Sequence, residues 1–191
     1  LTAKKKQSKM KIRLAADLQA DSIVDGEGIR TVVWTQGCPH ACKGCHNPQT
    51  HDFNGGVEVD VEEVIEALKE IKYQDGITLS GGDPVCQSEA CYEISKAAHE
   101  MGLNVWCYTG FTYEMMLLSP KKRKLLEQID VLVDGKFVLE EKSYDLYFKG
   151  SRNQRIIDVQ RSLKEERVVL VEKYAEDKKV SHYEKPSYMF I

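Results

Sequence analysis

The chain has 191 residues, of which 42% are hydrophobic and 30% charged, which is typical of one globular domain with a full core. Its net charge of −3 offers no basic surface for nucleic acid, so we expect no nucleic-acid partner. No apolar run approaches the roughly 20 residues that span a bilayer, and no apolar signal segment follows the basic residues 1–9. We therefore expect a cytoplasmic protein without a membrane partner, with residues 1–9 as a mobile tail and six cysteines kept as reduced thiols.

The first part of the chain predicts two strands separated by a turn. Residues 11–15 are compatible with an extended strand, and the sequence VDGEGIR at residues 24–30 carries the glycines of a turn. The run Ile29–Thr35 is rich in β-branched and aromatic residues, which favours a buried strand. The loop that leaves this strand contains the sequence CPHACKGC, at Cys38–Cys45.

Helical and extended patterns alternate after this loop. A helix begins at Asp60, where Asp60 and Glu63 have the spacing of a capping box. The following helices are expected at Val85–Met101, from a cap at Thr112 to Leu118, and from Ser119–Pro120 through Ile129. The strands between and after them are expected at Ile77–Ser80, Leu103–Gly110, Asp130–Gly135, Arg155–Val159 and near Val168.

Strands that alternate with helices predict parallel βαβ units. The units are too few for a closed eight-stranded barrel, which takes about 250 residues. We therefore predict an α/β fold, a partial and open β/α barrel with a mostly parallel sheet. The cysteine loop, the sequence GGDP at 81–84 and residues 108–110 and 134–135 each follow the carboxyl end of a strand, where such folds build their sites.

The three cysteines of the loop, Cys38, Cys42 and Cys45, have the spacing C-x3-C-x2-C. Thiolates are soft and strongly donating, so three of them in one loop predict a metal site. A 4Fe-4S cluster normally takes four thiolates, and three would leave one iron open. The alternative is a closed zinc site completed by His40, His46 or His51, although the cysteines supply one knuckle pair and not two.

These motifs together resemble a known family. The cysteine spacing with GGDP resembles the radical S-adenosylmethionine enzymes, and VDGEGIR looks like their subgroup that activates glycyl-radical enzymes. VLVDGKF at 131–137 and GSRNQRIIDV at 150–159 are similar to the anaerobic ribonucleotide reductase activating proteins. The resemblance covers residues 10–163, for which it implies a radical-SAM partial barrel, and leaves residues 164–191 as an extension without an assigned role.

The resemblance also implies a mechanism. Cys38, Cys42 and Cys45 would hold one 4Fe-4S cluster, and S-adenosyl-L-methionine would chelate the open iron. One electron from a low-potential donor such as a flavodoxin would cleave the sulfonium, and the 5′-deoxyadenosyl radical would take hydrogen from a glycine of the reductase large subunit. Gly81 and Gly82 would let the backbone approach the methionine end of this ligand. Beyond the cluster, the resemblance implies no catalytic side chain.

The resemblance implies further residues of the site, and three more are assigned by position alone. Gly44, Cys45 and His46 would lie beside the adenine, with His46 as the stacking ring because Gly44 stands where the family often has an aromatic residue. Thr109, Asp134 and Asn153 are candidates for the far wall of the site. Cys86, Cys91 and Cys107 have no cluster spacing and are expected to be buried, unreactive thiols.

Two alternative functions remain open from the sequence. One is an activase of pyruvate formate-lyase or another glycyl-radical enzyme, and the other is a zinc-binding interaction protein without turnover. The basic run Lys121–Lys124 lies in the first turn of a helix, where the dipole disfavours cations. A solvated face is the favoured interpretation of this run, and a docking surface for an acidic electron donor is the alternative.

Overall fold

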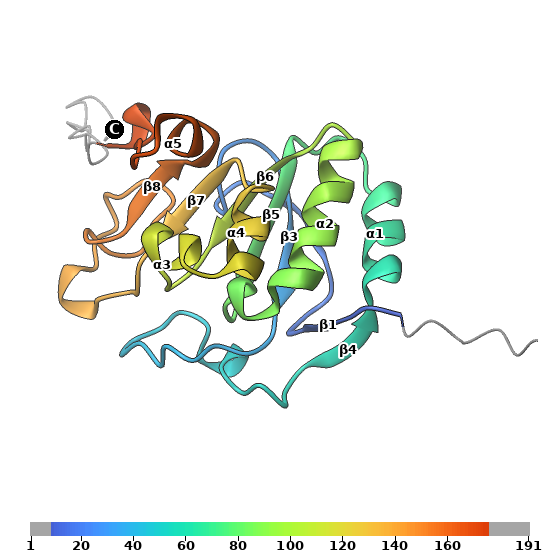
Figure 1. The fold of residues 1–191 in the computed structure, drawn as a ribbon. Helices are drawn as coiled ribbons and strands as arrows, with labels where there is room; N and C mark the ends of the chain where they lie inside the picture. Colours follow the sequence, from blue (N-terminus) through green and yellow to red (C-terminus); the bar gives the residue numbers. More distant parts are fainter. Residues whose placement is uncertain (1–8, 176–191) are drawn as a thin grey trace, which may run out of the picture.

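The structure, a computed structural model, describes residues 9–175, in which one eight-stranded sheet is covered by helices (Figure 1). Its strand order is β4-β1-β3-β5-β6-β7-β8, with β2 paired to β3 outside this path. All but the last residue of the predicted 1–9 tail lies outside the described residues. Among the residues described, no helix is long and apolar enough to cross a membrane.

Four parallel strands form the centre of the sheet. They are β3 (Arg30–Thr35), β5 (Gly76–Gly81), β6 (Asn104–Tyr108) and β7 (Val131–Asp134). Each strand was predicted within two residues of its observed ends. Apolar residues occupy both faces of these strands because helices cover one face and loops the other, as is usual in a parallel sheet.

Antiparallel strands flank this centre. They are β1 (Lys11–Leu14), β2 (Gln19–Ser22), β4 (Val57–Asp60) and β8 (Arg155–Asp158). The sequence analysis missed β2, which is mostly polar, and β4, in which valine alternates with an acidic residue; both are short and form strands with their partners. β4 and β8 stand at opposite ends of the strand order and are not paired, so the sheet stays open. This confirms the partial α/β barrel.

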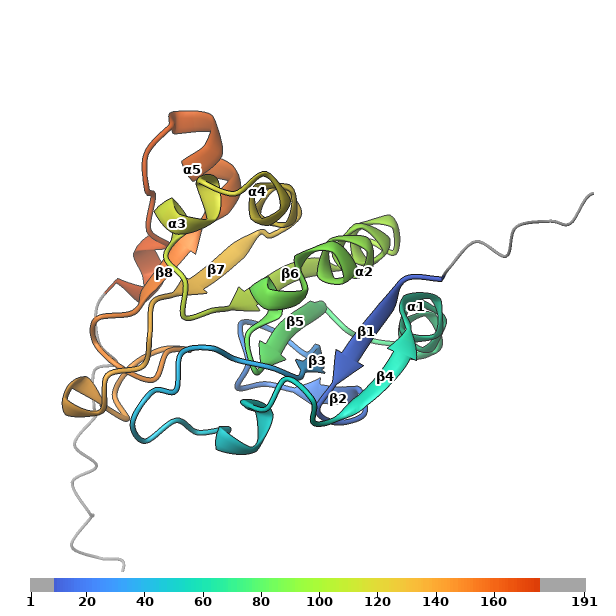
Figure 2. The ribbon, with the colours of Figure 1, turned by 60° about the horizontal axis from the view of Figure 1, so that its bottom comes forward.

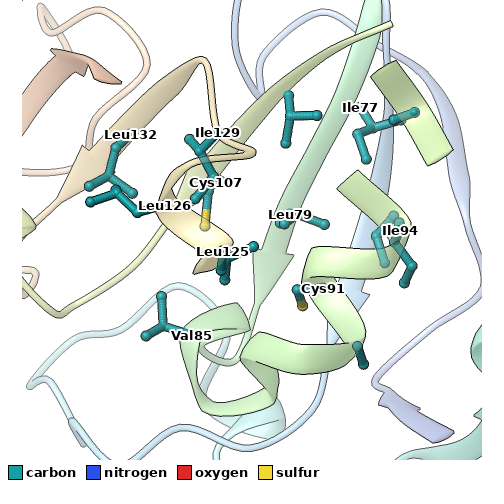
Figure 3. Close-up of a cluster of buried hydrophobic side chains, with 14 of the residues drawn as sticks. Ile77, Leu79, Val85, Cys91, Ile94, Cys107, Leu125, Leu126, Ile129 and Leu132 are labelled. Carbon is teal, nitrogen blue, oxygen red and sulfur yellow. The ribbon is translucent and has the colours of Figure 1, made fainter. Parts of the chain in front are cut away.

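The main helices cover one side of the sheet (Figure 2). They are α1 (Val61–Glu70), α2 (Ser88–Glu100), α3 (Tyr113–Leu117), α4 (Pro120–Leu126) and α5 (Val159–Glu165), with short 3-10 turns at Pro48–Thr50, Pro84–Gln87, Leu139–Glu141 and Glu172–Tyr174. Figure 3 shows the core between α2, α4 and the sheet, where Leu79, Ile94 and Leu125 are fully buried. The predicted caps of α3 and α4 are both in place, although only the Thr112 side chain accepts a backbone hydrogen bond.

Two of the three other cysteines are buried as predicted. Cys91 and Cys107 lie in the core of Figure 3, and burial raises the pKa of both thiols, which keeps them protonated and unreactive. The prediction is wrong for Cys86, which is exposed. The reason is local: residues 84–87 form a 3-10 turn, and α2 begins only at Ser88.

Three further local predictions are wrong. Asp60 precedes α1, but its carboxylate binds Lys11 at 2.5 Å instead of capping the helix, so no capping box forms. The predicted strand near Val168 is only an isolated bridge from Leu170 to β8. The helix from Pro120 ends at Leu126, and Ile129 is buried beyond it.

Residues beyond the predicted boundary at 163 contact the barrel. Val169 and Tyr174 are buried, and the Tyr174 ring lies 5.2 Å from Phe148 and 6.1 Å from Trp106 between centroids. The division into a barrel and an extension stays a prediction, because residues 176–191 lie outside the described part of the chain.

Candidate active site

The cysteine loop leaves the carboxyl end of β3 and folds back on the turn at Pro48–Thr50. The amide of Gly37 donates to the Thr50 carbonyl at 2.8 Å, and the amide of Cys38 donates to the His51 carbonyl at 3.1 Å. Within the loop, the Cys45 amide donates to the Cys42 carbonyl at 3.1 Å. All three thiols are half-buried, so each remains accessible to a ligand.

The GGDP turn lies directly against the start of this loop. The Gly82 amide donates to the Thr35 carbonyl at 2.7 Å, and the Asp83 amide donates to the Gly37 carbonyl at 2.8 Å. A Cβ atom on Gly82 would stand 2.5 Å from the Gly37 carbonyl oxygen, and one on Gly81 would stand 2.5 Å from that of Thr35. Both positions therefore require glycine for the turn after β5 to approach Cys38 this closely.

A buried polar network joins the loop to the ends of two strands. Asp83 is 1% exposed, and its carboxylate meets His40 Nε2 at 2.7 Å. The same carboxylate accepts from the Thr109 hydroxyl at 2.8 Å and from the Gly110 amide at 3.0 Å. It also caps the turn at Pro84–Gln87 by accepting from the Val85 amide at 3.0 Å. His40 is thus tied to the ends of β5 and β6.

These elements surround one cavity of about 490 Å³ at the carboxyl edge of the parallel strands. The loop after β3 and the connection between β7 and β8 lie together at this edge (Figure 2). Nine residues proposed from the sequence line the cavity: Cys38, His40, Cys42, Cys45, His46, His51, Gly81, Gly82 and Thr109.

Three other sequence candidates lie outside the lining. Gly44 has a φ of +75°, and a Cβ there would meet Leu139 at 2.9 Å, so this residue forms the turn of the loop. The Asp134 carboxylate accepts hydrogen bonds from Arg155 Nε at 2.9 Å and from the Tyr113 amide at 2.8 Å. Asn153 donates to the Lys136 carbonyl at 2.8 Å. The last two residues hold loops in place.

The structure adds lining residues that the sequence analysis did not single out. Phe137 lies beside His46, with ring centroids 5.1 Å apart, and Asp25 and Tyr108 line the same cavity. Phe137 and Asp25 belong to the blocks VLVDGKF and VDGEGIR, so the signal was present in motifs already recognised. The bond between His40 and Asp83 had no signal, because it joins residues 43 positions apart.

The three thiols do not all converge on one point in the described residues. In residues 9–175, Cys38, His40 and Asp83 form the group whose ligand atoms lie within 4.8 Å of one another, and Cys42 and Cys45 do not belong to it. One tetrahedral zinc with bonds of about 2.3 Å would draw its sulfurs to within about 3.8 Å. The three sulfurs are not all that close to one another here, which favours a group with several metal ions.

Burial raises the pKa of the Cys38 thiol, with a smaller contribution from the Asp83 charge. A thiolate at this position therefore needs a positively charged group beside it, which iron supplies.

Comparison with known proteins identifies the family. Residues 24–157 match the family model described as a 4Fe-4S single cluster domain. The anaerobic ribonucleoside-triphosphate reductase-activating protein of Haemophilus influenzae is 37% identical over 142 residues, which cover 70% of this chain and 90% of that protein. The protein of that name from Escherichia coli (strain K12) is 34% identical over 141 residues, with 69% and 90% covered. This chain belongs to the same family.

Two proteins with other names are also similar to this chain. The pyruvate formate-lyase-activating enzyme of Clostridium pasteurianum is 36% identical over 142 residues, which cover 71% of this chain and 57% of that protein. Among solved structures, QueE from Escherichia coli aligns with a TM-score of 0.47 and 11% identity over 65% of this chain and 70% of that chain.

Family membership confirms the resemblance seen in the motifs. The chain is an enzyme of the radical S-adenosylmethionine type, with a 4Fe-4S cluster and S-adenosyl-L-methionine as cofactors. The match to a cluster domain also favours iron over the zinc-binding protein that three thiols alone left open. Which residues bind each cofactor stays a prediction, and the lining of the cavity gives the candidates.

Proposed function

We propose that this chain activates an anaerobic ribonucleotide reductase by generating a glycyl radical on its large subunit. The observation that carries the proposal is the contact of Gly82 with Gly37, which places the paired glycines beside Cys38 in one cavity with all three thiols. The names of relatives that align over 90% of their length support the reductase as the substrate protein. Activation of pyruvate formate-lyase is the second candidate, supported by a relative of which 57% is covered.

Cys38, Cys42 and Cys45 would each bind one iron of the cluster, and one iron would stay open for the second cofactor. In the described chain, His40 is engaged by Asp83 and does not fill that position. When bound, the cluster and S-adenosyl-L-methionine supply a one-electron cleavage that yields a 5′-deoxyadenosyl radical.

The polypeptide positions and shields this chemistry. Gly81 and Gly82 let backbone groups approach the amino and carboxylate end of the ligand. His46, held against Phe137, offers a ring face for the adenine. The loops around the cavity would limit the access of oxygen and other reactants to the radical.

We further propose a cytoplasmic enzyme that receives its electron from a low-potential donor such as a flavodoxin. The basic run Lys121–Lys124 gives little support for a donor site. Lys121 pairs with Glu89 at 2.9 Å, Arg123 pairs with Glu127 at 3.3 Å, and Lys122 lies over the Phe111 ring at 3.6 Å. Most of these charges already have partners within the chain, which favours the solvated face.

The test is an anaerobic activation assay with the reconstituted protein. Incubation with S-adenosyl-L-methionine, a strong reductant and the reductase large subunit should produce a glycyl doublet by electron paramagnetic resonance, and pyruvate formate-lyase should give much less. A doublet on pyruvate formate-lyase alone would replace the proposal with the second candidate. No doublet on either protein, from a preparation with full iron content, would refute both.

A matched pair of cysteine variants controls this assay. Cys42 lines the cavity, whereas Cys86 is exposed on the turn before α2 and has no cluster spacing. Cys42→Ser should lose the cluster and the doublet together, and Cys86→Ser should keep both. Loss in both variants would show that general thiol damage, and not ligation, sets the result.

A further inference from the structure

We propose that Cys38, His40 and Asp83 form a second metal site, which binds one borderline divalent cation such as Zn²⁺ when the chain holds no cluster. Among the residues described, these three place one ligand atom each within 4.8 Å of one another. The site differs from a zinc site made of the three cysteines, because it takes one thiol from the loop and a carboxylate from the end of β5. Binding of the divalent ion is independent of the proposed function, whereas its competition with the cluster rests on the proposed ligation of the cluster by Cys38.

The three donors suit such an ion. Thiolate, imidazole and carboxylate all bind zinc at about 2.0–2.3 Å, and three protein ligands leave a fourth position for water. His40 Nε2 and Asp83 Oδ2 are 2.7 Å apart and share a proton. Replacing this proton by an ion requires the two atoms to separate by about half an ångström or more. Binding would also displace the proton of the Cys38 thiol.

The surroundings already orient two of the ligands. The His40 side chain is 7% exposed and the Asp83 side chain 1%. The Thr109 hydroxyl and the Gly110 amide donate to the Asp83 carboxylate, and the His40 ring stands edge-on to Phe111 with centroids 4.6 Å apart. Outer contacts of this kind fix ligand orientation in metal sites and change affinity by about 10–100-fold when removed.

The shared thiol has a consequence for the enzyme. Cys38 cannot bind the divalent ion and an iron of the cluster at the same time, so the two metal states exclude one another. Zinc bound after loss of the cluster would keep the half-buried Cys38 as a thiolate while blocking cluster assembly. Reassembly would then require the ion to leave first.

Cobalt is the probe for this site, because a bond from Co²⁺ to a thiolate absorbs in the near ultraviolet. We expect the reduced, cluster-free protein to bind one Co²⁺ with this absorption. Cys38→Ser should abolish the band, whereas Cys42→Ser and Cys45→Ser should keep it with affinities within about threefold. His40→Gln and Asp83→Asn each remove a proposed ligand, so they should weaken binding by at least the roughly tenfold that the loss of an outer contact costs.

The opposite pattern overturns the proposal. If Cys42→Ser or Cys45→Ser removes the band as fully as Cys38→Ser, the ion sits among the cysteines, and if the wild type binds no cobalt the site does not exist. Circular dichroism checks the fold of each variant. Because Asp83 also caps the turn after β5, His40→Gln decides alone if Asp83→Asn does not fold.

A competition experiment tests the exclusion. One equivalent of Zn²⁺ should slow the appearance of the brown cluster during reconstitution of the wild type, because the ion must leave Cys38 before an iron can bind there. The Cys45→Ser protein, which keeps the divalent site, should still bind zinc by direct metal analysis. Unchanged cluster formation in zinc-saturated wild type would show that the two sites do not share Cys38.

Discussion

The two ends of the four parallel strands treat polar groups in opposite ways. At the carboxyl end, three half-buried thiols line an open cavity of about 490 Å³. At the amino end, Arg30 is fully buried, and its guanidinium donates to the Thr78 hydroxyl at 2.7 Å, the Glu27 carbonyl at 2.9 Å and the Asn104 side chain at 2.8 Å. The carboxyl end leaves thiols available for a ligand, whereas at the amino end the Arg30 guanidinium donates to groups within the chain.

This difference separates function from folding within one motif block. Arg30 is the last residue of the sequence VDGEGIR, yet it stabilises the amino end of the parallel strands and does not line the cavity. Its charge lies 5.4 Å from the Trp106 ring, and burial lowers the pKa of its guanidinium to about 10. Asp25, five residues earlier, lines the cavity. A single motif therefore serves both ends of the strands.

The largest effect is expected at the carboxyl end, from Cys42→Ala. The variant should hold no intact cluster and should form less than about 1% of the wild-type glycyl radical, because the polypeptide offers one thiolate fewer. The free energy of unfolding of the cluster-free protein should change by no more than about 0.5 kcal/mol, since this thiol is half-exposed. Iron analysis, electron paramagnetic resonance and urea unfolding measure these quantities, and a variant with full cluster content would refute the ligand assignment.

The reverse pattern is expected at the amino end, from Arg30→Met. The substitution leaves buried acceptors, including Thr78 and Asn104, without their donor. Unfolding should become easier by about 3–5 kcal/mol, as each unsatisfied buried group costs about 1–3 kcal/mol. Cluster content per folded molecule should stay that of the wild type. If the free energy of unfolding in urea fell by less than about 1 kcal/mol, water would have to replace the guanidinium at the amino end of the strands.

The sequence predicted the carboxyl end much better than the amino end. Cys38, Gly82 and the other cavity residues follow strand ends, and strand ends can be located from local apolar patterns. Arg30 meets Asn104, a partner 74 residues away that no local pattern identifies. The same limit explains β2, which exists only through its pairing with β3.

Local rules also failed where a tertiary contact competed with them. Asp60 has the spacing of a capping box, but a salt bridge to Lys11 takes its carboxylate. Gly44 lies outside the lining of the cavity, and its left-handed backbone lets the loop approach Leu139. The spacing of residues along the chain predicted which motifs meet, and not which way each side chain points.

A pair of glycine substitutions can sharpen the contrast. In Gly82→Ala the new Cβ would meet the Gly37 carbonyl, so the turn must move away from Cys38. We expect a loss of about 1–3 kcal/mol in the free energy of unfolding and at least about tenfold weaker S-adenosyl-L-methionine binding by calorimetry.

Gly102→Ala is the matched control. This glycine has a φ of +79° with no atom within 4 Å of a new Cβ, and it lies between α2 and β6, outside the cavity lining. It should lose about 1–2 kcal/mol from backbone strain alone, with unchanged ligand binding. If both variants bound S-adenosyl-L-methionine with equal affinity, the close approach of Gly82 to Gly37 would play no part in binding this ligand.

The smallest effect concerns an ion pair near the carboxyl end. Arg155 bonds Glu114 at 2.8 Å and lowers the pKa of that carboxyl from 4.5 to about 2. The folded state therefore favours the ionised carboxylate, and this stabilisation is present above pH 4.5 and is lost as the pH falls toward 2. Glu114 is 55% exposed, so solvent screening limits the contribution to about 0.5–1 kcal/mol.

Glu114→Gln tests this account through unfolding by urea between pH 7 and pH 2.5. The variant should be less stable than the wild type at pH 7, and the difference should shrink steadily below pH 4.5. Glu62→Gln, at an exposed position of α1, should change the free energy of unfolding by less than about 0.5 kcal/mol at pH 7. A difference for Glu114→Gln that stays constant with pH would mean that packing, and not charge, links α3 to β8. Arg155 also donates from its Nε to Asp134 at 2.9 Å, so β8 should stay paired with β7 in this variant. Binding of the cofactors in the cavity should therefore be unchanged.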